Sequence, residues 1–395
     1  MATTRSESIW TPAFALLCMA QLLGYAQHSI LQPTFPLYVT QLGGSAFVVG
    51  LVLGSFAVTS VIFRPVIGHW ADRWNEAGVM ISGLLFMGAS LLLCFIPWVG
   101  ATMLANGLRG IGWGGLNAGG YTLLASSAPP TRRGEASGYY SGVQGSATIL
   151  FPALALWLIY APFGGFRVVF VVAVALAVMG AAVGAGMARY IPRVPHHRET
   201  DDSIPWWHEL FHFLERDVLL PSALLFCLNL TFPAVSSFIV LYAREIGIEN
   251  FGWYFVVSGA TSLLARPMLG RASDRIGRSR SLVAGFTLQM AALFLLIAVV
   301  SNLAGMIISG VLYMLGNAMG SSTTLALAVE RADPQRRGKA MATFSVAYPL
   351  SYGVGSLLTG SAVEIAGYIG MFLIVAGVGS SGLILTLMSG SKLKQ

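Results

Sequence analysis

Two side chains with distinctive chemistry interrupt the apolar stretches of this 395-residue sequence. Arg109 is the one basic residue well inside an apolar run, about eight residues, or ~12 Å along a helix, from one end of it. His28 lies at a similar depth in the first run. A guanidinium binds anions through paired hydrogen bonds, and an imidazole changes charge near neutral pH. The alternatives are an Arg109 that extends outward to the headgroups and a His28 that is a hydrogen-bonded core residue.

Further polar residues lie inside apolar runs, where such groups mark substrate or ion pathways. Gln21, Tyr25 and Gln32 share the run of His28 at spacings of four and seven, which places them near one helical face. In all, the candidate substrate or coupling residues are Arg109, His28, Gln21, Tyr25, Gln32, Asn229, Tyr313, Asn317, Tyr348 and Tyr352. We expect these residues to line a path for a small-molecule substrate.

Several other chemistries are excluded by what the runs lack. No Asp or Glu lies in the middle of a run, since Asp217, Glu245, Glu330 and Glu364 are all at ends or in loops. A cavity with Arg109 and no carboxylate should prefer anionic or neutral amphipathic solutes over cations. A membrane enzyme would need a nucleophile, metal or carboxylate pair at one level, so we predict no enzyme activity and no cofactor. Basic residues form no contiguous stripe, which argues against nucleic acid.

Metal sites and ATP-driven pumping have no sequence support either. The three cysteines are scattered through apolar runs and form no CxxC motif, so neither a metal site nor a disulfide framework is predicted. His208 and His212 are four residues apart, but without an HExxH pattern we interpret them as part of a solvated linker. No Walker A motif is present, so transport would have to draw on a gradient or on the solute itself.

The elements that must hold these residues are membrane-spanning helices. Hydrophobic residues make up 55% of the sequence and charged residues only 10%, with a mean hydropathy of +0.72. A helix needs about 20 mostly apolar residues to cross a bilayer, and barrel-type alternation is absent. The sequence therefore predicts an all-α membrane protein whose twelve spans are 10–39, 46–70, 77–97, 101–126, 135–160, 166–189, 217–242, 251–270, 280–301, 303–329, 338–363 and 367–389.

Charge asymmetry predicts how these spans are oriented. An even number of spans puts both termini on one side of the membrane. With the termini inside, nearly all Lys and Arg residues fall in inner loops, and only Arg167 and Arg244 fall at the outer edges. Positive residues collect on the cytoplasmic side. We therefore predict a multi-pass protein of the inner (cytoplasmic) membrane with both termini in the cytoplasm.

The two halves of the sequence match each other. Residues 64–73 and 266–275 share Arg, Pro, Gly, Asp and Arg at corresponding positions, and residues 130–136 match 334–340 at nearly the same offset. Internal repeats of this kind are typical of transporters. The sequence predicts a six-helix bundle in 1–189, a cytoplasmic linker in 190–216 with an interfacial helix near 205–214, and a second six-helix bundle in 217–395.

The repeated loops are candidate gates. An Asp at the inner mouth of a helix, followed by Arg, can pair with the opposite bundle in one state and separate in the other. For Asp72 and Asp274 we favour gating, because acidic residues do little for topology. For Arg278 and Arg280 a purely topogenic charge is the favoured alternative. The candidate gating residues are Gly68, Asp72, Arg73, Gly270, Asp274, Arg275, Arg278, Arg133 and Arg337.

These motifs carry a family resemblance. Gly270 to Arg280 (GRASDRIGRSR) resembles the loop motif of the major facilitator superfamily almost fully, and residues 68–77 resemble it in part. Arg109-Gly110-Ile111-Gly112-Trp113-Gly114 is similar to the family's fourth-helix motif, whose Arg is associated with coupling in proton-linked exporters. The fifth-helix antiporter motif is incomplete, since Phe151-Pro152-Ala153 stands where glycines would be expected. The chain most resembles the compact twelve-span bacterial exporters of drugs and metabolites.

The combined prediction is a secondary active transporter that works by alternating access. We expect efflux of a drug-like molecule or metabolite, anionic or neutral amphipathic rather than cationic. Uptake or exchange of an organic anion is the alternative, supported by the missing carboxylate. The expected partners are the solute and the lipid bilayer, and the expected oligomeric state is a monomer. If a proton is coupled, His28 is its best carrier; sodium coupling is the alternative, weakened by the lack of buried carboxylates. A receptor would not need matched inner gates.

Overall fold

The protein is a bundle of long helices. The computed structural model describes residues 9–73, 75–127, 132–190, 215–298, 302–333 and 337–390. Within these residues there are helices and turns and no strand. The predicted all-α fold is confirmed, as expected for a chain whose backbone polar groups must be satisfied inside lipid.

The helices divide between the two halves of the sequence, residues 9–190 and 215–390. The first half contains α1 (Pro12–Gln41), α2 (Ala46–Ile62), α3 (Arg64–Arg73), α4 (Glu76–Ser90), η1 (Leu91–Phe95), α5 (Val99–Ser127), α6 (Arg133–Tyr160) and α7 (Phe166–Met187). The second half contains η3 (Arg216–Val218), α9 (Leu219–Leu230), η4 (Ala234–Phe238), α10 (Ile239–Glu245), α11 (Gly252–Ile276), α12 (Arg278–Ala298), α13 (Leu303–Arg331) and α14 (Arg337–Met388).

Each of the twelve predicted spans overlaps a described helix over most of its length, although residues 299–301 of the ninth lie outside the described residues. Eight described helical segments are long and apolar enough to cross a membrane by length and composition alone. One of them belongs to α14, which contains two helices joined at Gly367 with φ 66°. That left-handed backbone conformation favours glycine, and it turns the chain between the predicted eleventh and twelfth spans.

Three predicted spans are not single α-helices. The third span is α-helical to Ser90 and continues as the 3-10 helix η1. The second span breaks at Phe63, so that α3 starts at Arg64 with Pro65 in its first turn, where a missing N–H costs least. The seventh span breaks after Leu230, and η4 is a π-helix that follows Pro233. Proline removes one backbone donor and crowds the preceding turn. Short π-helices often occur at functional sites.

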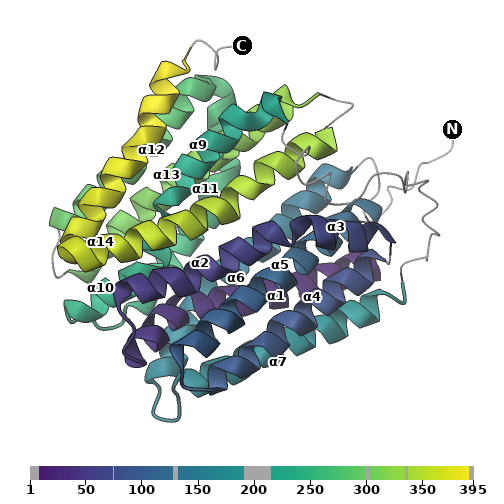
Figure 1. Ribbon diagram of the computed structural model, residues 1–395. Coiled ribbons are helices and arrows are strands. Elements are labelled where there is room, and N and C mark those ends of the chain that lie inside the picture. The colour runs from purple at the N-terminus through teal and green to yellow at the C-terminus, as the bar shows by residue number, and fades with distance from the viewer. Residues whose placement is uncertain are drawn as a thin grey trace.

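The two halves lie side by side (Figure 1). The start of α1 and the end of α14 lie at one end of the bundle, which we call the termini end, and the opposite end is called the far end. Between the halves, α2 packs against α14 and α6 packs against α11. The predicted linker helix near 205–214 lies outside the described residues, and the predicted domain limits stay a prediction.

Among the described residues, the buried apolar cluster that combines both halves lies toward the far end. One cluster of buried residues there combines Phe35 and Val49 of the first half with Phe238 and Phe372 of the second. Toward the termini end the buried residues form separate clusters, one around Leu116 in the first half and others within single halves. The halves therefore share a buried apolar core toward the far end, whereas the other clusters of described buried residues each lie within one half.

Candidate functional site

A small polar cavity lies between the halves near mid-span. Its volume is about 20 Å³. Helices α1, α2 and α5 of the first half and α14 of the second supply its walls. The lining residues are His28, Leu31, Gln32, Phe35, Leu53, Phe56, Asn106, Arg109 and Tyr352. The structure thus brings four of the predicted residues, Arg109, His28, Gln32 and Tyr352, to one cavity.

Arg109 is the central side chain of this cavity and is only 2% exposed. Its Nη1 donates a hydrogen bond to the Asn106 side-chain oxygen, and its Nη2 lies 3.3 Å from His28 Nδ1. An arginine always donates, so the tautomer that fits this contact has Nδ1 as the acceptor. The Arg109 Nε has no hydrogen-bond partner among the described residues. One donor of the buried guanidinium is therefore left unsatisfied in this conformation.

Aromatic rings surround the two nitrogen-bearing side chains. The guanidinium carbon of Arg109 is 5.4 Å from the ring centroids of both Phe35 and Phe56, within cation–π range. The His28 ring stacks on Trp113 with centroids 4.3 Å apart and an interplanar angle of 28°. Rings hold the charged groups in place and exclude water, which strengthens electrostatic interactions with any bound solute.

The electrostatic feature of the cavity is a buried cation without an acid. None of the described residues that line it is an Asp or Glu. A buried charge is expensive unless it is paired and hydrogen-bonded, and Asn106 offers only a neutral acceptor. Asn106 is itself fixed, because its Nδ2 donates to the Val52 carbonyl at 2.7 Å. An anion entering the cavity would supply the missing charge and bind through charge-assisted hydrogen bonds.

The other predicted residues of α1 also face α5. Gln21 Nε2 donates to the Leu116 carbonyl at 3.1 Å and Gln21 Oε1 accepts from Gln144 of α6 at 3.3 Å. The Tyr25 hydroxyl donates to Asn117 Oδ1 at 2.8 Å. These two side chains are engaged inside the first half and do not line the cavity. Gln21, Tyr25 and His28 thus share the helical face predicted from their spacing.

In the second half, polar residues meet around the break in the seventh span. Asn317 Nδ2 donates to Asn229 Oδ1 at 3.2 Å, and the Tyr313 hydroxyl lies 2.6 Å from Thr231 Oγ1. The Tyr352 hydroxyl lies 2.9 Å from Ser237 Oγ in the π-helix. Tyr352 therefore links the broken span to the cavity of the first half, whereas Tyr348 on the same helix is 46% exposed.

Sequence reasoning missed several residues that shape the cavity. Asn106, Phe35, Phe56 and Trp113 contact Arg109 or His28. Asn106 could have been found, because it lies three residues before Arg109 and so on the same helical face. The rings carry no such signal, since aromatic residues are common in apolar helices and only packing shows which of them meet.

At the far end, α2 and α14 approach backbone to backbone. A Cβ added at Gly50 would lie 2.6 Å from the Ser356 carbonyl oxygen, and one at Gly360 would lie 2.5 Å from the Ala46 carbonyl oxygen. Small residues permit this closeness. Beside it, Glu364 Oε2 accepts a hydrogen bond from the Phe47 amide at 3.1 Å, in the first turn of α2. A carboxylate from the second half therefore caps a helix of the first.

The predicted gating residues lie at the termini end. A Cβ at Gly68 would meet no atom within 4 Å, and Arg275 is exposed. Arg278 donates to Ser273 Oγ at 3.1 Å and to Glu330 Oε1 at 2.6 Å, both within its own half. The candidates outside what the structure describes are Gly270 and the side chains of Asp72, Arg73, Arg133, Asp274 and Arg337. One bond crosses the halves nearby, from Arg64 Nη1 to the Ser345 carbonyl at 3.2 Å.

Two helical halves around a buried polar cavity, joined at one end, have the architecture of a membrane carrier, and comparison with known proteins agrees. The family model of the Major Facilitator Superfamily matches residues 17–251 and 222–392. The chain belongs to the Major Facilitator Superfamily.

Individual relatives have low sequence identity to this chain but match most of its length. The multi-drug resistance efflux pump PmrA of Streptococcus pneumoniae is 26% identical over 293 residues, 70% of this chain and 71% of that one. The multidrug resistance protein MdtG of Klebsiella pneumoniae is 24% identical over 397 residues, 96% and 93% of the two chains. A solved POT family transporter in complex with 5-aminolevulinic acid superposes with a TM-score of 0.79 at 13% identity, over 97% of this chain and 96% of that one. The protein is thus a multi-pass membrane transporter of small molecules.

Proposed function

We propose that this transporter exports a small organic solute that is anionic or neutral and amphipathic. The observation that carries the proposal is Arg109, buried between the halves with a free Nε and no acidic residue among the described residues of the cavity. A cationic solute would face an uncompensated like charge there. An anionic group would complete the hydrogen bonding of the guanidinium and leave its apolar part against Phe35 and Phe56.

The same cavity supports alternating access. The solute would contact Arg109 of the first half and Tyr352 of the second, so its binding energy would depend on how the halves lie. A ligand shifts a conformational equilibrium only by its differential affinity for the two states. A site built from both halves provides that difference. We infer that the solute is enclosed as the halves rock about the cavity.

Export is the direction favoured by the relatives. PmrA is named as an efflux pump and MdtG as a multidrug resistance protein. The orientation in the membrane follows from the charge distribution, which supports cytoplasmic termini in the inner membrane. In that orientation the structure, joined at the far end, would open toward the cytoplasm and receive solute from inside. We propose that the monomer is the transporting unit, because both halves of the cavity come from one chain.

Proton coupling through His28 is the second part of the proposal. His28 contacts Arg109 directly, and a protonated imidazole could not accept the hydrogen bond from its guanidinium. Protonation would therefore separate the two groups and change the charge of the cavity. Loading of an anion and of a proton would then be linked through one contact.

Transport assays with the purified protein test the solute class. Proteoliposomes containing wild-type protein are given a panel of radiolabelled amphiphiles that differ in charge but share an aromatic body. We expect saturable transport of anionic and neutral members, and a loss of about 30-fold or more in kcat/KM for the anion in Arg109→Gln, because a buried charge-assisted contact is worth roughly 2–5 kcal/mol. Arg189→Gln, an exposed arginine at the end of the first half, is the matched control. Unchanged anion transport in Arg109→Gln contradicts the proposal.

A further inference from the structure

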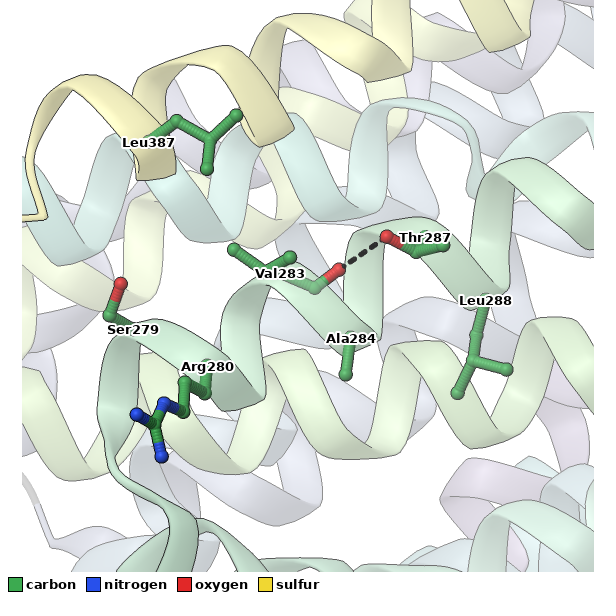
Figure 2. A pocket seen from close by; sticks show the side chains of 7 residues that line it. All are labelled: Ser279, Arg280, Val283, Ala284, Thr287, Leu288 and Leu387. Atoms are coloured by element: carbon green, nitrogen blue, oxygen red, sulfur yellow. Dashed lines mark hydrogen bonds between the residues drawn. The ribbon is translucent and has the colours of Figure 1, made fainter.

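A groove of about 650 Å³ runs along α12, beside the last turns of α14 (Figure 2). It lies in the second half and does not share a residue with the cavity around Arg109. Its lining residues are Ser279, Arg280, Val283, Ala284, Thr287, Leu288 and Leu387.

The groove changes from polar to apolar along its length. Ser279 and Arg280 lie in the first turn of α12, at the termini end. Leu288 follows Arg280 by eight residues in the sequence, which is roughly 12 Å deeper along a helix. The one hydroxyl among the deeper lining residues, that of Thr287, donates to the Val283 carbonyl at 2.8 Å and is thereby engaged by its own helix. Beyond the first turn the walls are therefore almost entirely carbon.

The polar end of the groove carries positive charge. Arg280 is exposed and has no hydrogen-bond or ion-pair partner within the described part of the chain. Its neighbour Arg278 is paired with Glu330 at 2.6 Å. The first turn of a helix adds partial positive charge from its free amides. Lys392 and Lys394 follow α14 in the sequence. The free guanidinium is the group at this end that is available to an anion.

We propose that the groove binds an anionic phospholipid, with its phosphate on Arg280 and one acyl chain along Val283, Ala284 and Leu288. The positive charge at the polar end of the groove matches the phosphate of such a lipid, and the apolar wall deeper along α12 matches its acyl chain. The groove opens on the outer surface of a membrane-spanning helix, where lipid rather than water is the available solvent. A water-soluble anion would satisfy Arg280 but leave the apolar wall uncovered.

Lipid binding to the purified full-length protein tests the proposal by native mass spectrometry. The probes are dioleoyl phosphatidylglycerol and dioleoyl phosphatidylcholine, which have the same chains and differ in net charge. We expect preferential retention of one phosphatidylglycerol. Arg280→Gln should weaken that retention about fivefold, which is what one basic residue near a membrane surface contributes. Ala284→Phe should reduce retention of both lipids, because it fills the groove. Arg189→Gln is the matched control for charge alone.

The outcomes separate the proposal from general surface attraction. Equal retention of the two lipids overturns it, as does an equal loss in Arg189→Gln and Arg280→Gln. Retention that survives Ala284→Phe overturns the acyl part and with it the site. Unchanged melting temperatures of the variants in lipid-free detergent verify that a loss of lipid is not a loss of fold. Glycerol phosphate, the headgroup without chains, should not compete at concentrations that match the lipid.

Discussion

Replacing Gly50 by alanine should weaken the junction of the halves at the far end. The added Cβ would lie 2.6 Å from the Ser356 carbonyl oxygen, with the Ser356 carbonyl carbon at 3.2 Å and Leu357 Cα at 3.3 Å. All three neighbours are backbone atoms, so no side-chain rotation relieves the clash and the helices must separate. Overpacking of this kind costs about 1–3 kcal/mol. Because the cost falls only on the state in which α2 and α14 touch, that state should lose about 5- to 150-fold in relative population.

Gly54→Ala is the matched control on the same helix. A Cβ there has Leu357 Cγ as its nearest neighbour at 3.5 Å, an ordinary contact. Both changes gain the same helix propensity from alanine, so their difference isolates the close approach.

Electron–electron distance measurements would read the equilibrium, with spin labels on Gln41→Cys and Glu249→Cys in a background without the native cysteines. We expect a longer-distance population at the far end in Gly50→Ala and the wild-type distribution in Gly54→Ala. Identical distributions in the two variants would refute the reasoning.

Three further predictions follow from single contacts. Glu364→Gln removes the charge that caps α2, and such caps are worth about 0.3–1 kcal/mol. The longer-distance population at the far end should therefore increase about two- to fivefold relative to the joined state. A distance distribution like that of wild type would contradict the capping role. His28→Ala should abolish the dependence of transport on a pH gradient while downhill exchange persists, and gradient-driven transport that survives the change would exclude His28 as the proton carrier. Asn317→Ala leaves the Asn229 side-chain oxygen without its donor and should lower the melting temperature in detergent by the equivalent of about 1–3 kcal/mol. The control Thr287→Ala removes only an exposed hydroxyl bonded to its own helix, so its melting temperature should equal that of wild type within error.

Much of the fold could be predicted because lipid limits the choices. All twelve predicted spans fall on helices, since a chain in hydrocarbon must satisfy its backbone within each segment. What failed was their regularity. The seventh span is interrupted around Pro233 and continues as a π-helix. The proline shows that the regular hydrogen bonding is disturbed there, but local composition does not show that the chain continues as a π-helix.

The candidate site was predictable in part. Arg109 and His28 were chosen for their similar depth, and the structure places their nitrogens 3.3 Å apart. Gln21 and Tyr25 were predicted because their spacing places them on the helical face of His28, yet they are bonded to α5 and α6 inside the first half. Depth and helical face can be inferred from spacing, but whether a side chain is already engaged by its own half cannot.

The sequence by itself determined the properties that are local: which segments enter lipid, which residues interrupt them with charge, and the repeated motifs that mark the superfamily. These follow from the free energy of moving each segment from water into a bilayer, which depends on its own composition. Only the tertiary structure decided which parts of the two halves meet. The contact of Glu364 with Phe47 joins residues 317 positions apart. Tyr352 likewise comes from the second half to line the cavity that contains Arg109. Such contacts depend on how two packed bodies lie against each other, and that placement is set by shape complementarity over a whole surface rather than by any one segment.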